Sequence, residues 1–259
     1  MYRRAVCAIF ALFAVAFASA ANAQVIAEDD FEQGSWKSFW GSRRSVTIST
    51  EQPRSGVRSA RFEFEAEPPG GDSFSELRFD LGREYRELTI EFDLYIPPNY
   101  FHRPESPNNN KFFRLWLNDY DDVEKLGASL LSQGTSGESR IGTDYSKEAH
   151  RSISTGVKNA PDFITASDKG KWTAIRIYVK AASDAENGII RIYKNGQLFL
   201  NDTGLRNHIP GTQGYRHGYL LGWANSGFAQ ETVFYIDNVR FLAGDAAKPA
   251  PKPPHLTVK

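Results

Sequence analysis

Apolar and polar residues alternate along most of the chain after residue 24, and this alternation has a period of two. The clearest segments are 61–65, 88–96 and 175–179, where every second side chain is apolar. Since successive side chains of a strand point to opposite faces, the pattern predicts half-buried strands in stacked antiparallel sheets. The same signals predict further strands at 25–31, 45–50, 74–81, 110–118, 126–132, 188–194, 197–201, 217–224 and 231–242, and no segment has the period of a long helix.

The residues between the predicted strands also favour an all-β fold. Asn195 and Gly196 separate two strand-like segments, and an Asn-Gly pair supplies the two positive-φ residues of a type I′ hairpin turn. With no linker-like break between 25 and 242, the pattern predicts one all-β domain over 24–243, an antiparallel β-sandwich of the jelly-roll type. The polar stretches 97–110 and 134–171 are too long for hairpin turns, and such loops commonly border a binding groove.

The two ends of the chain differ from the rest. Residues 1–23 have a basic start, an apolar run over 5–18 and an A-x-A end at 21–23, which predicts a secretory signal peptide and a secreted or periplasmic protein. The only cysteine, Cys7, lies inside this segment, so disulfides and thiolate metal sites are excluded for the exported protein. The Pro- and Lys-rich residues 244–259 predict a disordered tail.

The charge balance limits the partners. The chain has 31 Lys and Arg and 31 Asp and Glu; removal of 1–23 takes away Arg3 and Arg4 and no acid, leaving 29 basic residues. A neutral protein has no basic field for nucleic acid, and no later apolar run is long enough to span a bilayer. We therefore expect any charged ligand to be bound by local charges. We also expect a monomer.

Acidic residues near both ends of the domain are candidates for a metal site. Asp30 and Glu32 follow the first predicted strand, and Asp237 lies in the last. If these strands pair, the carboxylates come together, and hard oxygen ligands suit calcium. A solvated, acidic strand edge explains the same residues equally well.

The strand at 74–79 carries the first candidate for a binding groove. Glu76 and Arg78 share one face, while Leu77 and Phe79 point to the other. The polar pair either lines a concave groove or forms an exposed ion pair of little energetic value.

The segment 108–118 carries the second candidate. Alternation predicts one face with an arginine, a tryptophan and an asparagine, which suits sugars because an indole stacks on CH faces while polar groups bind hydroxyls or carboxylates. The predicted row on this face is Phe112, Arg114, Trp116 and Asn118, and the opposite row is Lys111, Phe113, Leu115 and Leu117. We count Arg114 as a catalytic candidate and Trp116, Asn118, Lys111 and Glu76 as substrate-binding candidates; a core role for Trp116 stays open.

Histidines and tyrosines supply candidate bases. Tyr100 and His102 lie in the long loop, and His217 opens a predicted strand. No pair of histidines has the spacing of a zinc site. An ordinary surface histidine is the alternative for His102 and for His217.

Three segments resemble a known superfamily: 29–32, the block 172–200 with Tyr-Lys-Asn-Gly at 193–196, and the closing Tyr-Ile-Asp-Asn-Val at 235–239. They resemble the concanavalin A-like jelly rolls, and most nearly the bacterial polysaccharide lyase and heparin-lyase-like branch. The resemblance implies a structural calcium ion on Glu32 and Asp237. It also implies a groove strand of the form Arg/Ser-Glu-Leu-Arg, which Glu76 and Arg78 fit, although Phe74 replaces the preceding arginine.

The residues present favour elimination over hydrolysis. A lyase for uronic-acid polymers needs cations or amides that stabilise an enolate, and a Tyr or His that takes the proton. Arg78, Arg114 and Asn118 suit the first role, and Tyr100, His102 or His217 the second. The Gln-x-His and Tyr-x-Lys-x-Gly-x-Tyr strands of alginate lyases are not found. The Glu-x-Asp-x-x-Glu strand of laminarinase-type hydrolases is broken by Ile96.

The sequence therefore predicts a secreted protein that acts on polysaccharide. The first candidate is a lyase that cleaves uronic-acid-containing polymers by β-elimination. A non-catalytic, lectin-like carbohydrate-binding module needs only the groove and its aromatic residues, and it stays open as the alternative. A purely structural envelope protein is the third class.

Overall fold

The computed structural model describes residues 24–117, 125–147, 151–154, 162–183, 187–207 and 213–245. The predicted signal peptide, Asn118 and residues 246–259 of the predicted tail lie outside the described residues. In the described part, no helix has the length and apolar character of a membrane span.

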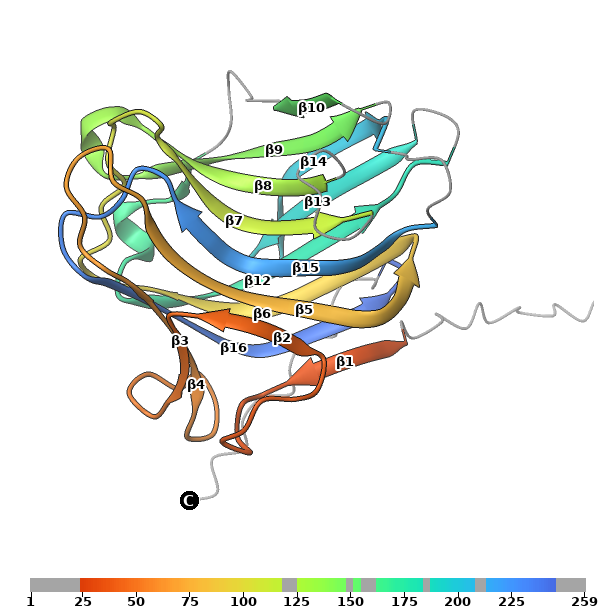
Figure 1. Ribbon diagram of the computed structural model, residues 1–259, viewed down its shortest axis with the longest axis horizontal. Helices are drawn as coiled ribbons and strands as arrows, with labels where there is room; N and C mark the ends of the chain where they lie inside the picture. The colour runs from red at the N-terminus through yellow and green to blue at the C-terminus, as the bar shows by residue number, and fades with distance from the viewer. Residues whose placement is uncertain are drawn as a thin grey trace, which may run out of the picture.

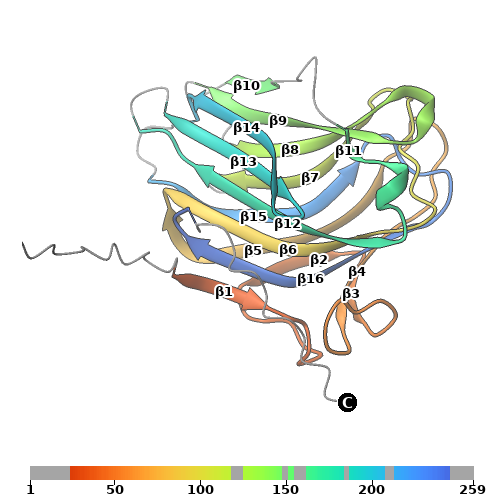
Figure 2. The ribbon, with the colours of Figure 1, turned by 180° about the vertical axis from the view of Figure 1, so that it is seen from behind.

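Two antiparallel eight-stranded sheets make up the fold, and strands far apart in the sequence lie side by side in each (Figures 1 and 2). We call them the front sheet and the back sheet. The back sheet has the order β14 (Gln197–Leu205), β13 (Gly188–Lys194), β12 (Lys171–Lys180), β6 (Glu87–Ile96), β16 (Thr232–Ala243), β4 (Ser59–Phe64) and β3 (Val46–Ser49), with β1 (Val25–Asp29) paired to β16. The front sheet has the order β10 (Arg151–Ser154), β9 (Ser139–Lys147), β8 (Lys125–Ser132), β7 (Asn109–Trp116), β15 (Tyr215–Ala224), β5 (Ser73–Tyr85) and β2 (Trp40–Arg44), with β11 (Asp162–Ile164) paired to β9.

The core lies between the sheets and is built from the apolar halves of the alternating strands. On β6 the apolar residues from Leu88 to Ile96 are at most 3 % exposed, and on β5 Leu77 and Phe79 are fully buried. Two 3₁₀ turns, Gly134–Ser136 and Ala166–Asp168, interrupt the loops. The β-sandwich prediction is confirmed, and all the predicted strands are present.

The turn expected from the sequence is present, and so is the strand pairing that the metal hypothesis required. Asn195 and Gly196 have φ values of 51° and 80° and join β13 to β14, as a type I′ turn requires. The first strand pairs with the last, with Asp29 opposite Val239.

The prediction was wrong where apolar alternation is weak. The stretch 134–171, expected as one long loop, contains β9, β10 and β11, and β2 was not expected. On β9, Ile141 is the only fully buried aliphatic side chain among serine, threonine, glycine and charged neighbours. Pairing of β9 with β8 and β11 supplies the backbone hydrogen bonds that its composition does not predict.

A bulge corrects the predicted faces of β7. The pairing of β7 with β8 shifts register between Lys111 and Phe113. Phe112 therefore points into the core, where its ring lies 5.1 Å from that of Phe163, while Phe113 also stays buried. Lys111 consequently shares the outer face with Arg114 instead of opposing it.

Candidate functional site

The outer face of the front sheet brings together polar side chains from five adjacent strands. Tyr219 on β15 lies directly opposite Arg78 on β5 and Arg114 on β7, and Arg114 lies opposite Gly127 on β8. Gly127 in turn lies opposite Asp144 on β9. Directly opposite residues of antiparallel strands share a face, so these five positions form one row across the sheet.

A second row runs beside the first. His217 on β15 lies opposite Asp80 on β5 and Trp116 on β7, and Trp116 lies opposite Lys125 on β8. The two rows touch, since the rings of Trp116 and Tyr219 have centroids 5.2 Å apart. The predicted groove residues Arg78, Arg114 and Trp116 therefore share one face with His217.

This face is the outer one because its residues alternate with core residues. Leu77 and Phe79 flank Arg78, and Leu115 and Leu220 follow Arg114 and Tyr219; all four apolar side chains are fully buried between the sheets. Alternation then turns both arginines and the tyrosine away from the core.

A bulge in β15 positions Tyr219. Leu221 and Gly222 have φ values of 55° and 127°, and the pairing of β15 with β7 shifts register between Leu220 and Ala224. A Cβ atom added at Gly222 would lie 2.7 Å from Cε2 of Tyr219, so the ring packs directly on the glycine. Bulges of this kind redirect side chains beside active sites.

Arg114 is a buried cation held across the neighbouring strands. Its side chain is 4 % exposed, and its Nη1 donates to Asp144 Oδ1 over 2.5 Å. Nη2 donates to Ser129 Oγ over 3.2 Å. A Cβ at Gly127 would lie 2.3 Å from Arg114 Nη1, so only a glycine leaves room for the guanidinium to reach Asp144.

Glu76 supports Arg78 from beneath. The Arg78 Nε donates to Glu76 Oε1 over 2.5 Å, and the Glu76 side chain is only 1 % exposed while that of Arg78 is 32 % exposed. Burial raises the pKa of Glu76, against the lowering effects of Arg78 and Arg44. A carboxylate this buried is out of reach of a polymer, so Glu76, predicted as a substrate-binding residue, positions Arg78 instead.

His217 belongs to a charged cluster at one end of the face. Its Nε2 lies 3.3 Å from Asp80 Oδ2. Arg216 donates to both oxygens of Asp80, over 2.7 and 2.8 Å. The hydrogen bond from Arg216 is the main cause that lowers the pKa of Asp80 to about 2, so this carboxylate stays ionised beside the imidazole.

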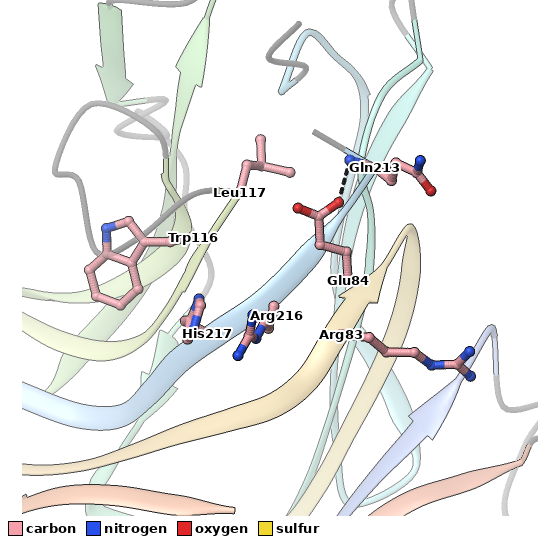
Figure 3. A pocket seen from close by; sticks show the side chains of 7 residues that line it. All are labelled: Arg83, Glu84, Trp116, Leu117, Gln213, Arg216 and His217. Carbon is pink, nitrogen blue, oxygen red and sulfur yellow. Dashed lines mark hydrogen bonds between the residues drawn. The ribbon is translucent and has the colours of Figure 1, made fainter. Parts of the chain in front are cut away.

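Two hollows open on this face. The His217 hollow, of about 560 Å³, is lined by Arg83, Glu84, Trp116, Leu117, Gln213, Arg216 and His217 (Figure 3). Figure 3 shows that these side chains come from the ends of β5, β7 and β15 and from the segment before β15, where the Gln213 N–H donates to Glu84. The Lys111 hollow, of about 240 Å³, lies over β7, β8 and β9 and includes Lys111, Arg114, Lys125 and Asp144.

These hollows carry excess positive charge on a chain with as many acids as bases. Five cations line them: Arg83, Arg216, Lys111, Arg114 and Lys125. Among the described residues that line them, the carboxylates are those of Glu84 and Asp144, and Asp80 pairs with Arg216 from outside the lining. The hollows therefore suit an anionic ligand, although the whole chain is neutral. This agrees with the expectation that a charged ligand is bound by charges close to it.

Tyr100 and His102 lie elsewhere, in the interior. The Tyr100 ring packs on those of Phe228 and Phe234, and both candidate residues are at most 1 % exposed. His102 Nε2 donates to the carbonyl oxygen of Asn108, so its Nδ1 accepts from the Ser139 hydroxyl. Burial raises the pKa of Tyr100 and lowers that of His102 to about 4. The structure does not bring them to the front face, and we remove both as candidate bases.

The candidate metal ligands hold a loop. Oxygens of Glu32 accept from the backbone N–H groups of Val57 and Arg58, and Asp237 Oδ2 accepts from those of Arg54 and Ser55, over 2.9 to 3.0 Å. N–H groups present their positive ends at the position that a cation would take.

Asp30, the third candidate ligand, does not complete a calcium site with Glu32 and Asp237. Asp30 is exposed, and its Oδ1 accepts from the N–H of Glu32. Within the described residues no three His, Cys, Asp or Glu side chains cluster as a metal site would require. The residues therefore do not fit the six to eight oxygen ligands of calcium, and we assign no step to it.

The sequence analysis missed several residues of this face, among them Tyr219, Asp144 and Lys125. Tyr219 was visible as an alternating residue of the predicted strand 217–224. Asp144 lies in a segment expected to be a loop, and Lys125 directly precedes a predicted strand. Only the strand order of the sheet places them beside Arg114.

An antiparallel jelly roll whose open face joins arginines, a tyrosine, a histidine and a tryptophan has the features of a carbohydrate-active protein. A family model described as polysaccharide lyase matches residues 30–240. The chain therefore belongs to the polysaccharide lyase family. A search of curated proteins finds no match.

Solved structures share the fold at low sequence identity. An endo-β-1,4-glucuronan lyase from the fungus Trichoderma reesei is 14 % identical, with a TM-score of 0.58 over 80 % of this chain and 92 % of that one. An alginate lyase from Chlorella virus is 11 % identical, with a TM-score of 0.58 over 85 % of this chain and 100 % of that one. A cellulose-induced protein is 11 % identical, with a TM-score of 0.57 over 86 % and 100 %.

Proposed function

We propose that this polysaccharide lyase cleaves a uronic-acid-containing polymer by β-elimination on the front face of the sandwich. The observation that carries the proposal is the position of Tyr219 between Arg78 and Arg114, one strand away on either side. The similar glucuronan and alginate lyases act on uronic-acid polymers, which agrees with this substrate class.

β-Elimination removes the proton on C5 of a uronate and breaks the C4–O4 bond. The electron pair of the C5–H bond becomes the C4=C5 double bond, and the leaving O4 takes up a proton, so no water is consumed. The C5 proton is weakly acidic, and negative charge develops on the carboxylate as it leaves. A cation fixed beside that carboxylate lowers the barrier.

Arg78 and Arg114 take different parts in this chemistry. Arg78 is partly exposed and Glu76 holds its Nε, so we assign the Arg78 guanidinium to the substrate carboxylate. Arg114 is already paired with Asp144, so it contributes a fixed, nearly neutralised dipole beside Tyr219 rather than a full charge.

Tyr219 and His217 carry the protons. We assign the Tyr219 phenol to protonate the leaving oxygen, because it lies at the centre of the row. His217 takes the C5 proton on Nδ1, because its Nε2 faces the ionised Asp80, which stabilises the imidazolium that forms. Trp116 is 4 % exposed and packs on Tyr219, so its role is to hold the tyrosine ring in place beneath the sugar.

Incubation of the purified protein with glucuronan, alginate and heparin tests the proposal. A lyase produces unsaturated ends that absorb ultraviolet light, in amounts equal to the reducing ends formed. A hydrolase produces reducing ends without that absorbance. Binding without either product overturns the lyase proposal and leaves the lectin-like module.

We also propose that residues 1–23 direct export and that the protein acts as a monomer. The basic start and A-x-A end of the segment support export. Amino-terminal sequencing of protein from the medium or periplasm should begin at Gln24, and sizing by light scattering should give a single chain.

A further inference from the structure

A row of three aromatic residues crosses the outer face of the back sheet, on the opposite side of the sandwich from the candidate site. Trp172 on β12 lies directly opposite Tyr95 on β6, and Tyr95 lies opposite Tyr235 on β16. These three strands lie side by side in the sheet (Figure 2). Leu94 and Ile236, which precede and follow two of the rings in the chain, are fully buried in the core, so alternation turns the rings outward. We call the three residues the back row.

The rings of the back row contact one another without lying in one plane. The ring centroids of Trp172 and Tyr95 are 5.6 Å apart, and the planes meet at 59°. Those of Tyr95 and Tyr235 are 6.0 Å apart, and the planes meet at 72°. Tyr235 is 8 % exposed and its phenol donates to Glu51 over 2.5 Å, whereas Trp172 and Tyr95 are partly exposed. The indole and the Tyr95 ring are therefore the surfaces of the row that a ligand can reach.

A small residue lies beside the indole. Ala174 is the next residue on the same face of β12, and it is exposed. Asp93 lies opposite Ala174, and its Oδ2 accepts from the side-chain amide of Asn238 over 2.9 Å. The CH groups of a sugar ring stack on aromatic faces while its hydroxyls bind polar groups at the side. Trp172, Ala174 and Asp93 together provide such an apolar surface with a polar border.

Among the described residues, carboxylates outnumber the cation at one end of the back row. Arg61 on β4 lies opposite Tyr235 and forms ion pairs with Glu51, Glu63 and Glu231. The side chains of these three acids are 62, 37 and 58 % exposed, and that of the arginine is 20 % exposed. An ionised carboxylate accepts hydrogen bonds and donates none, so it suits sugar hydroxyls and repels a uronate. The local charge here is thus opposite to that of the hollows on the front sheet.

We propose that the back row binds a neutral polysaccharide chain, with hexopyranose rings stacked on Trp172 and Tyr95. The row extends over two strand spacings, about 10 Å, which is longer than one sugar ring and favours a polymer. Because its rings are tilted against one another, it suits a single chain in solution rather than the flat surface of a crystalline polymer. This surface goes beyond the proposed β-elimination and does not depend on it: the protein would hold one glycan on the back sheet while the front sheet acts on another.

Titration calorimetry with two neutral hexasaccharides, cellohexaose and mannohexaose, tests this surface. Wild type should bind at least one of them, and Trp172→Ala should bind it about tenfold more weakly, because a stacked tryptophan carries much of the energy of such a contact. Trp172→Phe should recover part of the affinity. Trp223→Ala is the matched control, since it removes an indole that is 41 % exposed on β15 of the front sheet, and it should bind as wild type does. Thermal melting checks that each variant is folded.

Two results overturn the proposal. One is that neither hexasaccharide binds to wild type. The other is that folded Trp172→Ala binds as tightly as wild type, which would place the binding elsewhere. Neither result affects the lyase proposal, and a wild type that cleaves no uronate polymer leaves the back row untouched, because the calorimetry requires no cleavage.

An oligoglucuronate measures the charge preference of the back row. It is titrated into Tyr219→Phe protein, which should cleave it slowly, with and without the additional Trp172→Ala substitution. The second substitution should not change this binding, which should weaken with added salt, whereas binding of the neutral hexasaccharide should be insensitive to salt. Loss of oligoglucuronate binding with Trp172→Ala would show that the back row takes acidic sugars and would overturn its assignment to a neutral glycan.

Discussion

The ring of Tyr219 packs against the indole of Trp116, with 5.2 Å between their centroids. Gly222 touches the same tyrosine ring from the bulge that follows it. The phenol is thus fixed from two sides while it lies between the two arginines. A residue that transfers a proton must be held in a fixed position relative to the reacting atoms, and these two contacts hold the phenol in this way.

Replacement of Tyr219 by phenylalanine should lower kcat on glucuronan by about 10² to 10⁴, the usual contribution of a positioned acid or base. The melting temperature should change little, since the ring and its contact with Trp116 remain. Tyr95→Phe, on β6 of the back sheet, is the control and should keep full activity. A Tyr219→Phe variant as active as wild type would show that another group protonates the leaving oxygen.

Gly127→Ala should damage the site through Arg114. The new Cβ would lie 2.3 Å from Arg114 Nη1 and 2.5 Å from the Phe113 carbonyl oxygen, so the guanidinium is displaced from Asp144 and the backbone of β7 must shift. We expect a loss of about 2 to 4 kcal/mol in the free energy of unfolding and reduced kcat. The same substitution in an Arg114→Ala background gives the cost of the clash with the Phe113 carbonyl oxygen alone, because the guanidinium is absent there. Denaturant unfolding that shows equal losses in the two backgrounds would place the effect in the backbone.

Glu76 should act as a positioning residue for Arg78. Glu76→Gln keeps an oxygen that accepts from Arg78 Nε, so KM and kcat should stay within about threefold of wild type, whereas Glu76→Leu releases the arginine and should raise KM about tenfold. Because burial already raises the pKa of Glu76, the neutral glutamine costs little stability. Rescue by glutamine distinguishes positioning from chemistry; a glutamine variant as inactive as the leucine variant would mean that the charge itself is needed.

His102 should make the protein sensitive to acid. Its pKa is about 4 in the folded state against 6.5 in the unfolded chain, so the unfolded state binds more protons between these values. Stability is then fully present above pH 6.5 and falls by about 3 kcal/mol as pH falls from 6.5 to 4. Chemical unfolding of wild type and His102→Gln across this range measures the difference, because only the wild type should show this part of the slope. Parallel curves would contradict the buried, neutral imidazole.

The contacts of Glu32 and Asp237 predict the response to a chelator. With N–H groups already bonded to their oxygens, removal of calcium should leave the melting temperature unchanged. Glu32→Ala should still destabilise the protein by about 0.5 to 1.5 kcal/mol, because the partly exposed N–H groups of Val57 and Arg58 exchange this acceptor for water. A lower melting temperature with chelator, restored by calcium, would reinstate the metal that the family resemblance implies.

The alternation of apolar and polar residues was enough to predict the strands in which every second side chain is apolar. Leu77 and Phe79 are buried where the pattern placed them, and Arg78 emerges on the other face. It failed at Phe112, where a bulge in β7 moves one residue out of phase, and at β9, where serine and glycine hide a paired strand. Period-two patterns record burial, and they do not record which strand lies next to which.

The sequence by itself determined the all-β class, the hairpin at Asn195–Gly196 and the presence of arginines on strand faces. Only the tertiary structure decided that β15 lies between β5 and β7, which brings Tyr219 between Arg78 and Arg114. It alone also buried Tyr100 and His102. The physical reason is that a strand's own residues fix which face is wet, whereas its neighbours are chosen by packing of the whole sandwich, through contacts between residues far apart in the chain.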